Sequence, residues 1–476
     1  MSELHDECGV FGIFKNEPDI DIVEETYLAL YALQHRGQTG AGIAVNDNGN
    51  MRYYKDFGMI PEALPEPELS RLGNGQIALG HVKYSSGDEV DPANLAPLVM
   101  RYIKGQLALC MNGAITNYHE LREELNHGAA IFQSNGDTEI IAYLVARARI
   151  KAPTIEEAVR EAVNQLKGAY AAVLMSPSQL IGVRDPMGIR PLCYGKIGSS
   201  YVIASESCVF DSLGGEFIRD IQPGEILVID SDGVHSYTEN CGEKTALCLF
   251  EYVYFSRPDS VVDGVSVVKA RQRAGKLLAQ QHPIDADIVC AVPDCGIESA
   301  IGYSMESGIR YATGLIKNKY IGRAFNDRKK NEEYLMRIKL NALTYNIEGQ
   351  RVIVIDDSIL KGKTSRHIVE LLRQAGAKEV HMLIASPPFR NPCYLNSDTN
   401  TKEKLIASQK SIEEICEYIG ADSLGFLSAE SLKEIAKECH IGFCDACFTG
   451  EYPLDVSDTS REDKYSQKIK QSGISE

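Results

Sequence analysis

The sequence predicts two domains of different fold class, a layered α+β domain followed by an α/β domain with a mainly parallel sheet. Its 476 residues are enough for two or three compact cores. In the first half, short strand-like runs outnumber helices and come in hairpin-like pairs, which favours sheets packed together with helices outside. In the second half, β-branched apolar runs alternate with helices, which indicates a parallel sheet buried on both faces.

The first domain is expected over residues 8–235. Its predicted strands are GVFGIF, GIAV, IALGHVKY, QLALCM, YAAVLM, YVIAS and EILVID, and the segment NDNGN after Val45 is typical of a turn. Two amphipathic helices, TEIIAYLVARARI and IEEAVREAVNQL, lie between the strands. The polar, poorly periodic segment HSYTENCGEKTAL then separates this domain from the next.

The second domain is expected over residues 248–440. Its predicted strands IVCAVP, RVIVID and VHMLIAS alternate with the helices IESAIGYSMESG and SRHIVELLRQAG. Residues 441–476 contain a cysteine-bearing segment and then a tail with almost no apolar content, which we expect to be loosely ordered.

Charge and cysteine content exclude several classes of function. The net charge of -17 repels a nucleic-acid backbone, and no stretch approaches the roughly 20 apolar residues of a membrane span. The start, MSELHDECGVFG, is neither basic nor apolar enough for a secretion signal, so a cytoplasmic location is expected. Thirteen cysteines in such a protein should be reduced, so clustered ones indicate metal binding or nucleophilic chemistry.

Two adjacent acids, Asp356 and Asp357, follow the predicted strand RVIVID and precede a loop that enters a helix at about Arg366. A strand, tight loop and helix N-terminus point several backbone N–H groups at one anion. A nucleotide-triphosphatase loop is excluded, because it needs glycine at position 357. The acids suit the hydroxyls of a ribose or a hydrated Mg²⁺. From the residues alone, a helix-capping acidic turn is the alternative.

Cys8 begins another candidate site, because it precedes an apolar strand very near the start of the chain. Removal of residues 1–7 would leave Cys8 with a free α-amino group, whose pKa of roughly 8 suits it to accept the thiol proton. From the residues alone, a buried structural thiol is the alternative.

Ordered motifs in both halves resemble known families. Six motifs occur in the order seen in class II glutamine amidotransferases: LQHRGQTGAGIA, GHVKYSS, NLAPL, CMNGAITN, SNGDTEII and VRDPMGIRPL. VIVIDDSILKGKTS resembles the substrate loop of type I phosphoribosyltransferases, AVPDCG their pyrophosphate loop, and GLIKNKYIGRAF their mobile loop. Together they resemble the glutamine phosphoribosylpyrophosphate amidotransferase family over nearly the whole chain.

In the first domain the resemblance implies an N-terminal-nucleophile fold, layered α/β/β/α, in which loss of the propeptide 1–7 exposes Cys8 to attack the glutamine amide. Asn112 and the backbone of Gly113 should form the oxyanion hole. Asp137 should hold the glutamine α-amino group, and Lys83 the glutamine carboxylate. The family usually has arginine at that last position, so glutamine binding should be weaker or less selective.

In the second domain the resemblance implies a phosphoribosyl pyrophosphate site reached by an ammonia channel. Asp356 and Asp357 should hold the ribose hydroxyls and Mg²⁺, while the following loop holds the 5-phosphate. The basic mobile loop should close over the substrate. The implied binding residues are Asp356, Asp357, Ser358, Lys361, Gly362, Lys363, Thr364, Ser365, Lys317 and Arg323, and Lys319 adds local positive charge. From the residues alone, a solvated loop is the alternative for this basic stretch.

A CxxC pair in FCDACFTGEYP is weak evidence of a site when taken alone. One branch of the family carries a 4Fe–4S cluster on four cysteines, and this chain has a cysteine in each matching segment. The implied ligands are Cys248, Cys393, Cys444 and Cys447. The alternative is a tetrahedral Zn²⁺ on the same thiolates, or one that uses Cys439 and His440; only the resemblance separates the two.

The expected function is synthesis of 5-phosphoribosylamine from glutamine and phosphoribosyl pyrophosphate, the first step of purine nucleotide synthesis. The resemblance also implies a homo-oligomer inhibited by purine nucleotides. Two alternatives remain: a divergent relative with a weakened glutaminase that uses ammonia, and a silent nucleotide-binding regulator. Departures from the family pattern at Lys83, Thr39, Gly40 and Lys363 keep the first alternative open.

Overall fold

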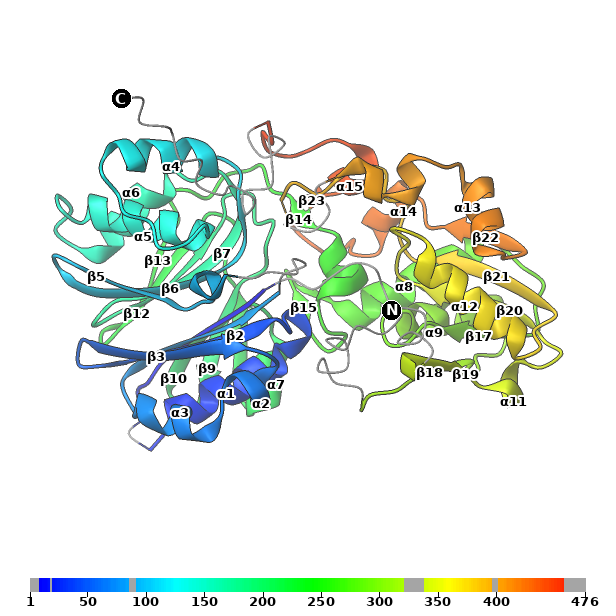
Figure 1. Cartoon of the computed structure of the whole chain (residues 1–476), viewed down its shortest axis with the longest axis horizontal. Coiled ribbons are helices and arrows are strands. Elements are labelled where there is room, and N and C mark those ends of the chain that lie inside the picture. Colours follow the sequence, from blue (N-terminus) through cyan, green and yellow to red (C-terminus); the bar gives the residue numbers. More distant parts are fainter. Residues whose placement is uncertain (1–7, 18, 85–90, 321–337, 396–400, 458–476) are drawn as a thin grey trace, which may run out of the picture.

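The computed structural model describes residues 8–17, 19–84, 91–320, 338–395 and 401–457. The expected propeptide 1–7 and Arg323 lie outside these residues. Two domains lie side by side, the first built around two stacked antiparallel sheets and the second around one parallel sheet (Figure 1). No helix within the described ranges is long and apolar enough to cross a membrane.

The first sheet of the first domain has seven strands in the order β11-β9-β10-β1-β4-β2-β3, all paired antiparallel. The β2–β3 hairpin turns at Asn48 and Gly49, which confirms the turn expected after Val45. The strands are β1 (Gly9–Phe14), β2 (Gly40–Asp47), β3 (Asn50–Phe57), β4 (Ile77–Lys83), β9 (Cys193–Ile197), β10 (Ser200–Ala204) and β11 (Glu216–Asp220).

The second sheet has six antiparallel strands in the order β13-β12-β8-β7-β6-β5. One apolar cluster lies between the two sheets and includes Val10 and Leu79 from the first and Cys110 and Val173 from the second. The strands are β5 (Leu98–Tyr102), β6 (Gly105–Ile115), β7 (Gly168–Met175), β8 (Leu180–Arg184), β12 (Ile226–Asp230) and β13 (Gly233–Tyr237).

Helices cover the outer faces of both sheets, so the predicted α/β/β/α layering is confirmed (Figure 1). In α6, the buried residues Ile155, Ala158, Val159 and Ala162 recur with the helical period and face the second sheet. The first sheet is covered by α1 (Ile22–Ala32), α2 (Ile60–Ala63), α3 (Glu66–Leu72) and α7 (Cys208–Leu213), and the second by α4 (Tyr118–His127), α5 (Asp137–Ala148) and α6 (Ile155–Val163).

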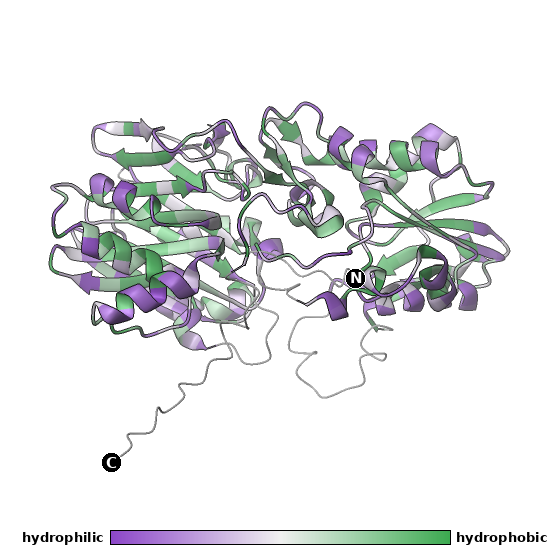
Figure 2. Cartoon of the chain, turned by 90° about the horizontal axis from the view of Figure 1, so that it is seen from above, coloured by the Kyte–Doolittle hydropathy of each residue, from purple (hydrophilic) through white to green (hydrophobic). Residues whose placement is uncertain are grey.

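The second domain is built on the parallel sheet β17-β20-β21-β22, as predicted. Its strands carry apolar residues on both faces, and hydrophilic residues concentrate on the outer turns of the helices (Figure 2). The strands are β17 (Ile288–Ala291), β20 (Arg351–Asp356), β21 (Glu379–Ile384) and β22 (Ser423–Phe426). One face packs on α8 (Val267–Gln281), α9 (Ile297–Ser307) and α14 (Ala429–Glu434), the other on α12 (Lys363–Gln374) and α13 (Ile412–Ile419).

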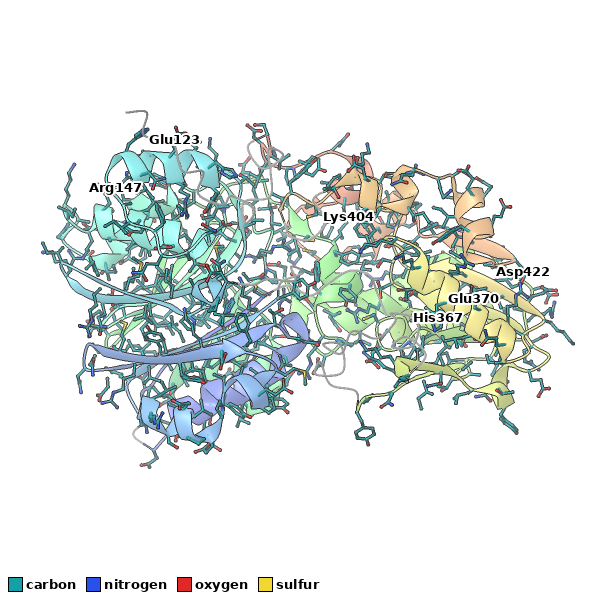
Figure 3. The ribbon with its side chains drawn as sticks, in the orientation of Figure 1. Glu123, Arg147, His367, Glu370, Lys404 and Asp422 are labelled. Atoms are coloured by element: carbon teal, nitrogen blue, oxygen red, sulfur yellow. The ribbon has the colours of Figure 1, made fainter. Side chains whose placement is uncertain are left out.

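Helix α12 begins at Lys363, three residues before the expected start at Arg366. Gly362 adopts φ +78°, and its carbonyl accepts the hydrogen bond from the N–H of Arg366 at 3.0 Å, so Lys363, Thr364 and Ser365 form the first turn. Farther along α12, the exposed Glu370 pairs with Arg366 at 3.0 Å (Figure 3).

Short elements join the two domains. A π-helical turn, Glu251–Phe255, begins the second domain, and β15 (Val261–Val262) with β16 (Val265–Ser266) forms a small hairpin after it. The C-terminal segment returns to the junction, because β23 (Phe443–Cys444) pairs in parallel with β14 (Leu247–Cys248). The remaining described strands and α-helices are β18 (Leu315–Lys317), β19 (Leu340–Ala342), α11 (Thr344–Ile347) and α15 (Ala446–Thr449).

Candidate functional site

Cys8 lies at the end of the first sheet, directly before β1. The next residue, Gly9, pairs with Val82 on β4, so Cys8 lies next to the β4 end that carries Lys83. The carbonyl of Cys8 accepts a hydrogen bond from Arg36 Nε at 3.2 Å. The backbone of the predicted nucleophile is therefore fixed both by a sheet and by a buried guanidinium.

Asn112 and Gly113 lie on β6 in the second sheet, opposite Ala171 and Tyr170. Gly113 has φ +114°, and a Cβ there would lie 2.0 Å from the Ala169 carbonyl oxygen, so no other residue fits. Asn112 is buried, and its Nδ2 has no hydrogen-bond partner among the described residues. A buried amide donor of this kind is suited to an anionic oxygen that forms only during reaction.

His81 on β4 links the predicted oxyanion-hole residues, Asn112 and Gly113, to the first sheet. Its Nε2 donates to the carbonyl of the preceding residue, Met111, at 3.2 Å. Burial, with the nearby charge of Lys83, lowers the pKa of His81 from 6.5 to about 3, so the ring is neutral. Asp137, at the start of α5, is buried and its Oδ2 accepts the Ile115 N–H at 2.7 Å. The predicted glutamine-binding residues Lys83 and Asp137 thus both lie beside this part of β6.

The predicted phosphoribosyl loop lies at the carboxyl end of β20, where ligands bind in open parallel sheets. Asp356, Asp357 and Ser358 are buried, as are Thr364 and Ser365 in the first turn of α12. The N–H of Asp357 donates to Asp356 Oδ1 at 2.9 Å. Lys361 and Lys363 are exposed beside this loop and supply local positive charge.

The predicted pyrophosphate loop reaches the same edge of the sheet. The N–H of Val292 donates to the Ile355 carbonyl at 2.9 Å, and a Cβ on Gly296 would lie 2.3 Å from the same oxygen. Burial and the charges of Asp357 and Asp356 raise the pKa of the Cys295 thiol, which places it beside the two acids. Lys317 Nζ pairs with Asp294 Oδ2 at 3.1 Å.

Comparison with known proteins is consistent with both half-sites. A model of the glutamine amidotransferase domain matches residues 90–212. The amidophosphoribosyltransferase of Bacillus subtilis (strain 168) is 44% identical over 459 residues, which are 95% of each chain. That of Methanocaldococcus jannaschii is 44% identical over 467 residues, 94% of this chain and 98% of its own. The chain belongs to the amidophosphoribosyltransferase family.

Solved structures of this family have the same fold. The glutamine phosphoribosylpyrophosphate amidotransferase of B. subtilis, complexed with ADP and GMP, matches with a TM-score of 0.87 and 44% identity, covering 94% of this chain and 98% of its own. A structure described as the allosteric regulatory enzyme of purine biosynthesis matches with a TM-score of 0.90 and 43% identity, covering 97% and 100%. The resemblance and the fold class expected from sequence are therefore confirmed.

Four cysteines, implied above as cluster ligands, lie at the junction of the two domains. Cys248 and Cys444 are paired in the β14–β23 register. Cys393 packs with both of them against one apolar cluster, and the Cys447 carbonyl accepts from the N–H of Asn391 at 3.0 Å, two residues before Cys393. Burial raises the pKa of the Cys447 thiol, and the charges of Cys393, Cys248 and Cys444 raise it further. As they stand, no three His, Cys, Asp or Glu side chains in the described part of the chain could hold a metal ion.

The alternative zinc ligand Cys439 packs against the core of the second domain, as Cys248 and Cys447 also do. Burial raises the pKa of the Cys439 thiol, and a hydrogen bond with Tyr252 opposes that rise. His440 beside it is exposed. Cys439 therefore differs from the others in its bond to Tyr252, whereas Cys248, Cys393 and Cys444 pack together against the apolar cluster of Ile189 and Leu395.

Sequence reasoning missed several buried charged residues beside Cys8. One network of fully buried side chains consists of Arg36, Glu206 and Glu251. A signal was present, because Glu251 interrupts the apolar run LFEYVYF and a buried charge requires a partner. The sequence could not name that partner, which lies 215 residues away at Arg36.

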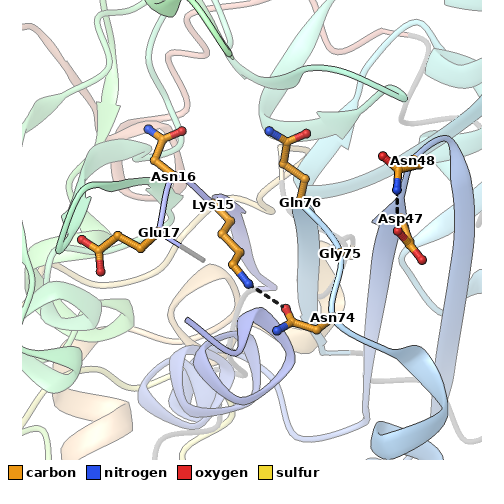
Figure 4. Close-up of a pocket in the computed structure, with 8 residues that line it drawn as sticks. All are labelled: Lys15, Asn16, Glu17, Asp47, Asn48, Asn74, Gly75 and Gln76. Atoms are coloured by element: carbon orange, nitrogen blue, oxygen red, sulfur yellow. Dashed lines mark hydrogen bonds between the residues drawn. The ribbon is translucent and has the colours of Figure 1, made fainter. Parts of the chain in front are cut away.

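A shallow hollow on the first domain lies at the other end of β1 from Cys8 (Figure 4). Lys15 Nζ donates to Asn74 Oδ1 at 3.3 Å across it. None of the predicted site residues lines it, and most of its residues are exposed or half-buried. It is therefore separate from the two half-sites.

Proposed function

We propose that this chain makes 5-phosphoribosylamine from glutamine and phosphoribosyl pyrophosphate, and so performs the first step of purine nucleotide synthesis. The observation that carries this proposal is the presence, in one chain of this family, of two sets of residues. Cys8 precedes β1 of one sheet and the buried amide of Asn112 lies on β6 of the sheet stacked on it, and a pair of buried acids lies at the carboxyl end of a parallel sheet. The activities of the named relatives support the same conclusion.

In the glutaminase half, the Cys8 thiol attacks the amide carbon of glutamine, and the α-amino group exposed by loss of residues 1–7 takes the thiol proton. Asn112 Nδ2 and the Gly113 N–H stabilise the oxyanion of the tetrahedral intermediate. Collapse of that intermediate releases ammonia and leaves a thioester, which water hydrolyses to glutamate. Lys83 and Asp137 bind the carboxylate and amino group of the substrate.

In the transferase half, ammonia attacks the ribose carbon that bears pyrophosphate, and the carbon–oxygen bond to pyrophosphate breaks. Asp356 and Asp357 hold the ribose hydroxyls, and the N–H groups at the start of α12 hold the 5-phosphate. Lys317 and Arg323 neutralise the departing pyrophosphate. Mg²⁺, when bound near the two acids, offsets the negative charge of the pyrophosphate.

The cysteine group is proposed to bind a 4Fe–4S cluster that ties the C-terminal segment to the domain junction. Four neighbouring thiols are the donor set that such a cluster requires, and zinc on the same thiolates is the alternative. Binding requires the side chains to turn toward a common centre.

Regulation, assembly and location follow the same reasoning. Purine nucleotides are proposed as feedback inhibitors, since the B. subtilis relative was solved with ADP and GMP. A homo-oligomer is proposed from the family. A reducing compartment, the cytoplasm, suits a chain whose thirteen cysteines are present as thiols.

The proposed division of labour predicts opposite effects for two variants. Cys8→Ala should abolish synthesis from glutamine and leave synthesis from ammonium salts largely intact, because only amide cleavage needs the thiol. Asp357→Ala should abolish synthesis from both nitrogen sources, because ribose positioning precedes both. Steady-state rates with each nitrogen source provide the measurement. Full glutamine activity in the first variant, or normal ammonia-dependent activity in the second, would refute the corresponding half-site.

A further inference from the structure

A buried charged network links the nucleophile segment to the second domain. Arg36 has no exposed side-chain surface, and its partners include Cys8, Glu206 and Glu251. Its Nε donates to the Cys8 carbonyl at 3.2 Å, and its Nη1 pairs with Glu206 Oε1 at 2.5 Å. Its Nη2 and Nη1 donate to the two carboxylate oxygens of Glu251 at 2.9 and 3.1 Å.

The two carboxylates come from different domains. Glu206 follows β10 in the first domain, where burial alone would raise its pKa but His35 and Arg36 hold it well below its ordinary range. Glu251 begins the π-helical turn of the second domain. Ser256, which ends that turn, donates from its Oγ to Glu251 Oε2 at 2.7 Å, and so anchors the carboxylate.

The second domain also anchors Ser256 itself. Arg271 on α8 is buried, and its Nη2 donates to the Ser256 carbonyl at 2.7 Å while its Nε donates to the Tyr252 carbonyl at 2.9 Å. The position of the Glu251 carboxylate is therefore fixed by the transferase domain, through the π-helical turn and α8.

The paired hydrogen bonds between Arg36 and Glu251 set the orientation of the Arg36 guanidinium. A guanidinium is planar, so two parallel hydrogen bonds to one carboxylate fix the plane and its rotation. That plane also contains Nε–H, which points at the Cys8 carbonyl. One hydrogen bond to Glu206 does not set the rotation of the guanidinium, whereas the two hydrogen bonds to Glu251 do.

We propose that Glu251 is a positioning residue for Cys8 that acts through Arg36, so that the transferase domain sets the orientation of the glutaminase nucleophile. This inference rests on the proposed role of Cys8 as the nucleophile. Without the two hydrogen bonds to Glu251, Arg36 loses the contacts that set the plane of its guanidinium, and its Nε–H is no longer aligned on the Cys8 carbonyl. A small misplacement of a nucleophile slows attack far more than it weakens substrate binding.

The test is Glu251→Gln, which keeps the shape of the side chain and removes its charge. The expected result is a fall of roughly tenfold to a hundredfold both in kcat with glutamine and in the rate of Cys8 alkylation by iodoacetamide. The KM for glutamine and the turnover with ammonium salts should stay at the wild-type values. Alkylation across a pH series reports on the thiol directly and without substrate.

Asp263→Asn is the matched control. Asp263 forms the other buried fork across the same boundary, with its Oδ1 and Oδ2 accepting from Arg184 Nη1 and Nη2 at 2.9 and 2.7 Å. No described contact joins that pair to Cys8. The control variant should unfold at a lower temperature than wild type but keep its rate of Cys8 alkylation and its kcat with glutamine.

Wild-type alkylation and glutamine turnover in Glu251→Gln would overturn the inference. Loss of ammonia-dependent turnover in that variant would also overturn it, because Glu251 would then serve the whole fold and not Cys8. Cys8→Ala, measured alongside, separates this outcome from failure of the proposed function: if Cys8 is not the nucleophile, that variant keeps glutamine-dependent synthesis.

Discussion

Buried polar side chains in the first domain each hold one backbone group of the glutaminase half-site. Arg36 holds the Cys8 carbonyl, His81 the Met111 carbonyl and Asp137 the Ile115 N–H. Burying a polar group costs free energy unless it is hydrogen-bonded, so these contacts explain why such residues are tolerated in the core. Asn112 differs, because its buried Nδ2 has no partner in the described part of the chain. Under the proposed function, this donor would bind the oxyanion that forms during reaction.

Lys83 provides a test of glutamine recognition. Replacing it with arginine should lower the KM for glutamine severalfold, because a guanidinium forms two parallel hydrogen bonds with a carboxylate where an ammonium presents a point charge. Turnover with ammonium salts should not change. Initial rates at varied glutamine concentration provide the measurement, and an unchanged or higher KM would mean that another residue holds the carboxylate.

His81 makes stability depend on pH. Its pKa is about 3 in the folded chain and 6.5 in the unfolded chain. Between these two values the unfolded chain binds one more proton than the folded chain, so the free energy of unfolding decreases as the pH falls. From this group the loss at about pH 5 is about 2 kcal/mol. His81→Gln, whose amide can still donate to Met111, should lack this loss. Denaturant unfolding of both proteins at about pH 7 and about pH 5 measures it, and equal losses would contradict the prediction.

At the scale of elements, the sequence predicted well both the strands and the strand–loop–helix order around Asp356 and Asp357, because each depends on local pattern. The continuous β-branched run in RVIVID and the turn residues after Val45 are examples, confirmed by β20 and the β2–β3 hairpin. The start of α12 was missed by three residues, since the left-handed conformation of Gly362 depends on its surroundings. The Arg36–Glu251 pair was also missed, because partners far apart in sequence leave no local pattern. The roles of the site residues remain predictions.

Gly362 tests how the start of α12 serves phosphate binding. Gly362→Ala places a Cβ at φ +78° and 2.9 Å from Ile406 Cδ1, so the folded state should lose about 1–2 kcal/mol. The first turn of α12 should shift with it, and the KM for phosphoribosyl pyrophosphate in the ammonia-dependent reaction should rise. Denaturant unfolding and initial rates measure the two effects.

Gly349→Ala is the control for that experiment. Gly349 has φ +73°, but a Cβ there meets no described atom within 4 Å, and the residue lies before β20, away from the loop. It should lose similar stability and keep its KM for phosphoribosyl pyrophosphate. An equal rise in KM in both variants would mean that general loss of stability, and not the geometry of α12, weakens binding.

At the scale of the whole molecule, the contacts that join the domains include the buried Arg36–Glu251 and Arg184–Asp263 pairs and the half-buried cysteine group. The cysteine group packs on an apolar cluster that contains Ile189 from the first domain and Leu395 from the second. Because its members come from segments separated by up to 199 residues, from Cys248 to Cys447, a shared cluster would stabilise the junction more than any one segment.

The cysteine group therefore predicts a visible signature of the assembled molecule. The purified protein should be brown and oxygen-sensitive, and Cys447→Ser should remove both the colour and the iron, since loss of one thiolate opens a 4Fe–4S cluster to attack. Its unfolding temperature should fall, because the C-terminal segment is then held only by its packing and by the β14–β23 pair.

Cys439→Ser is the control: Cys439 lies beside Tyr252 outside the group, so that variant should keep its colour. Absorbance spectra, metal analysis and thermal unfolding test the three outcomes together. A colourless, active protein with stoichiometric zinc would establish the zinc alternative, because the same thiolates can hold either metal.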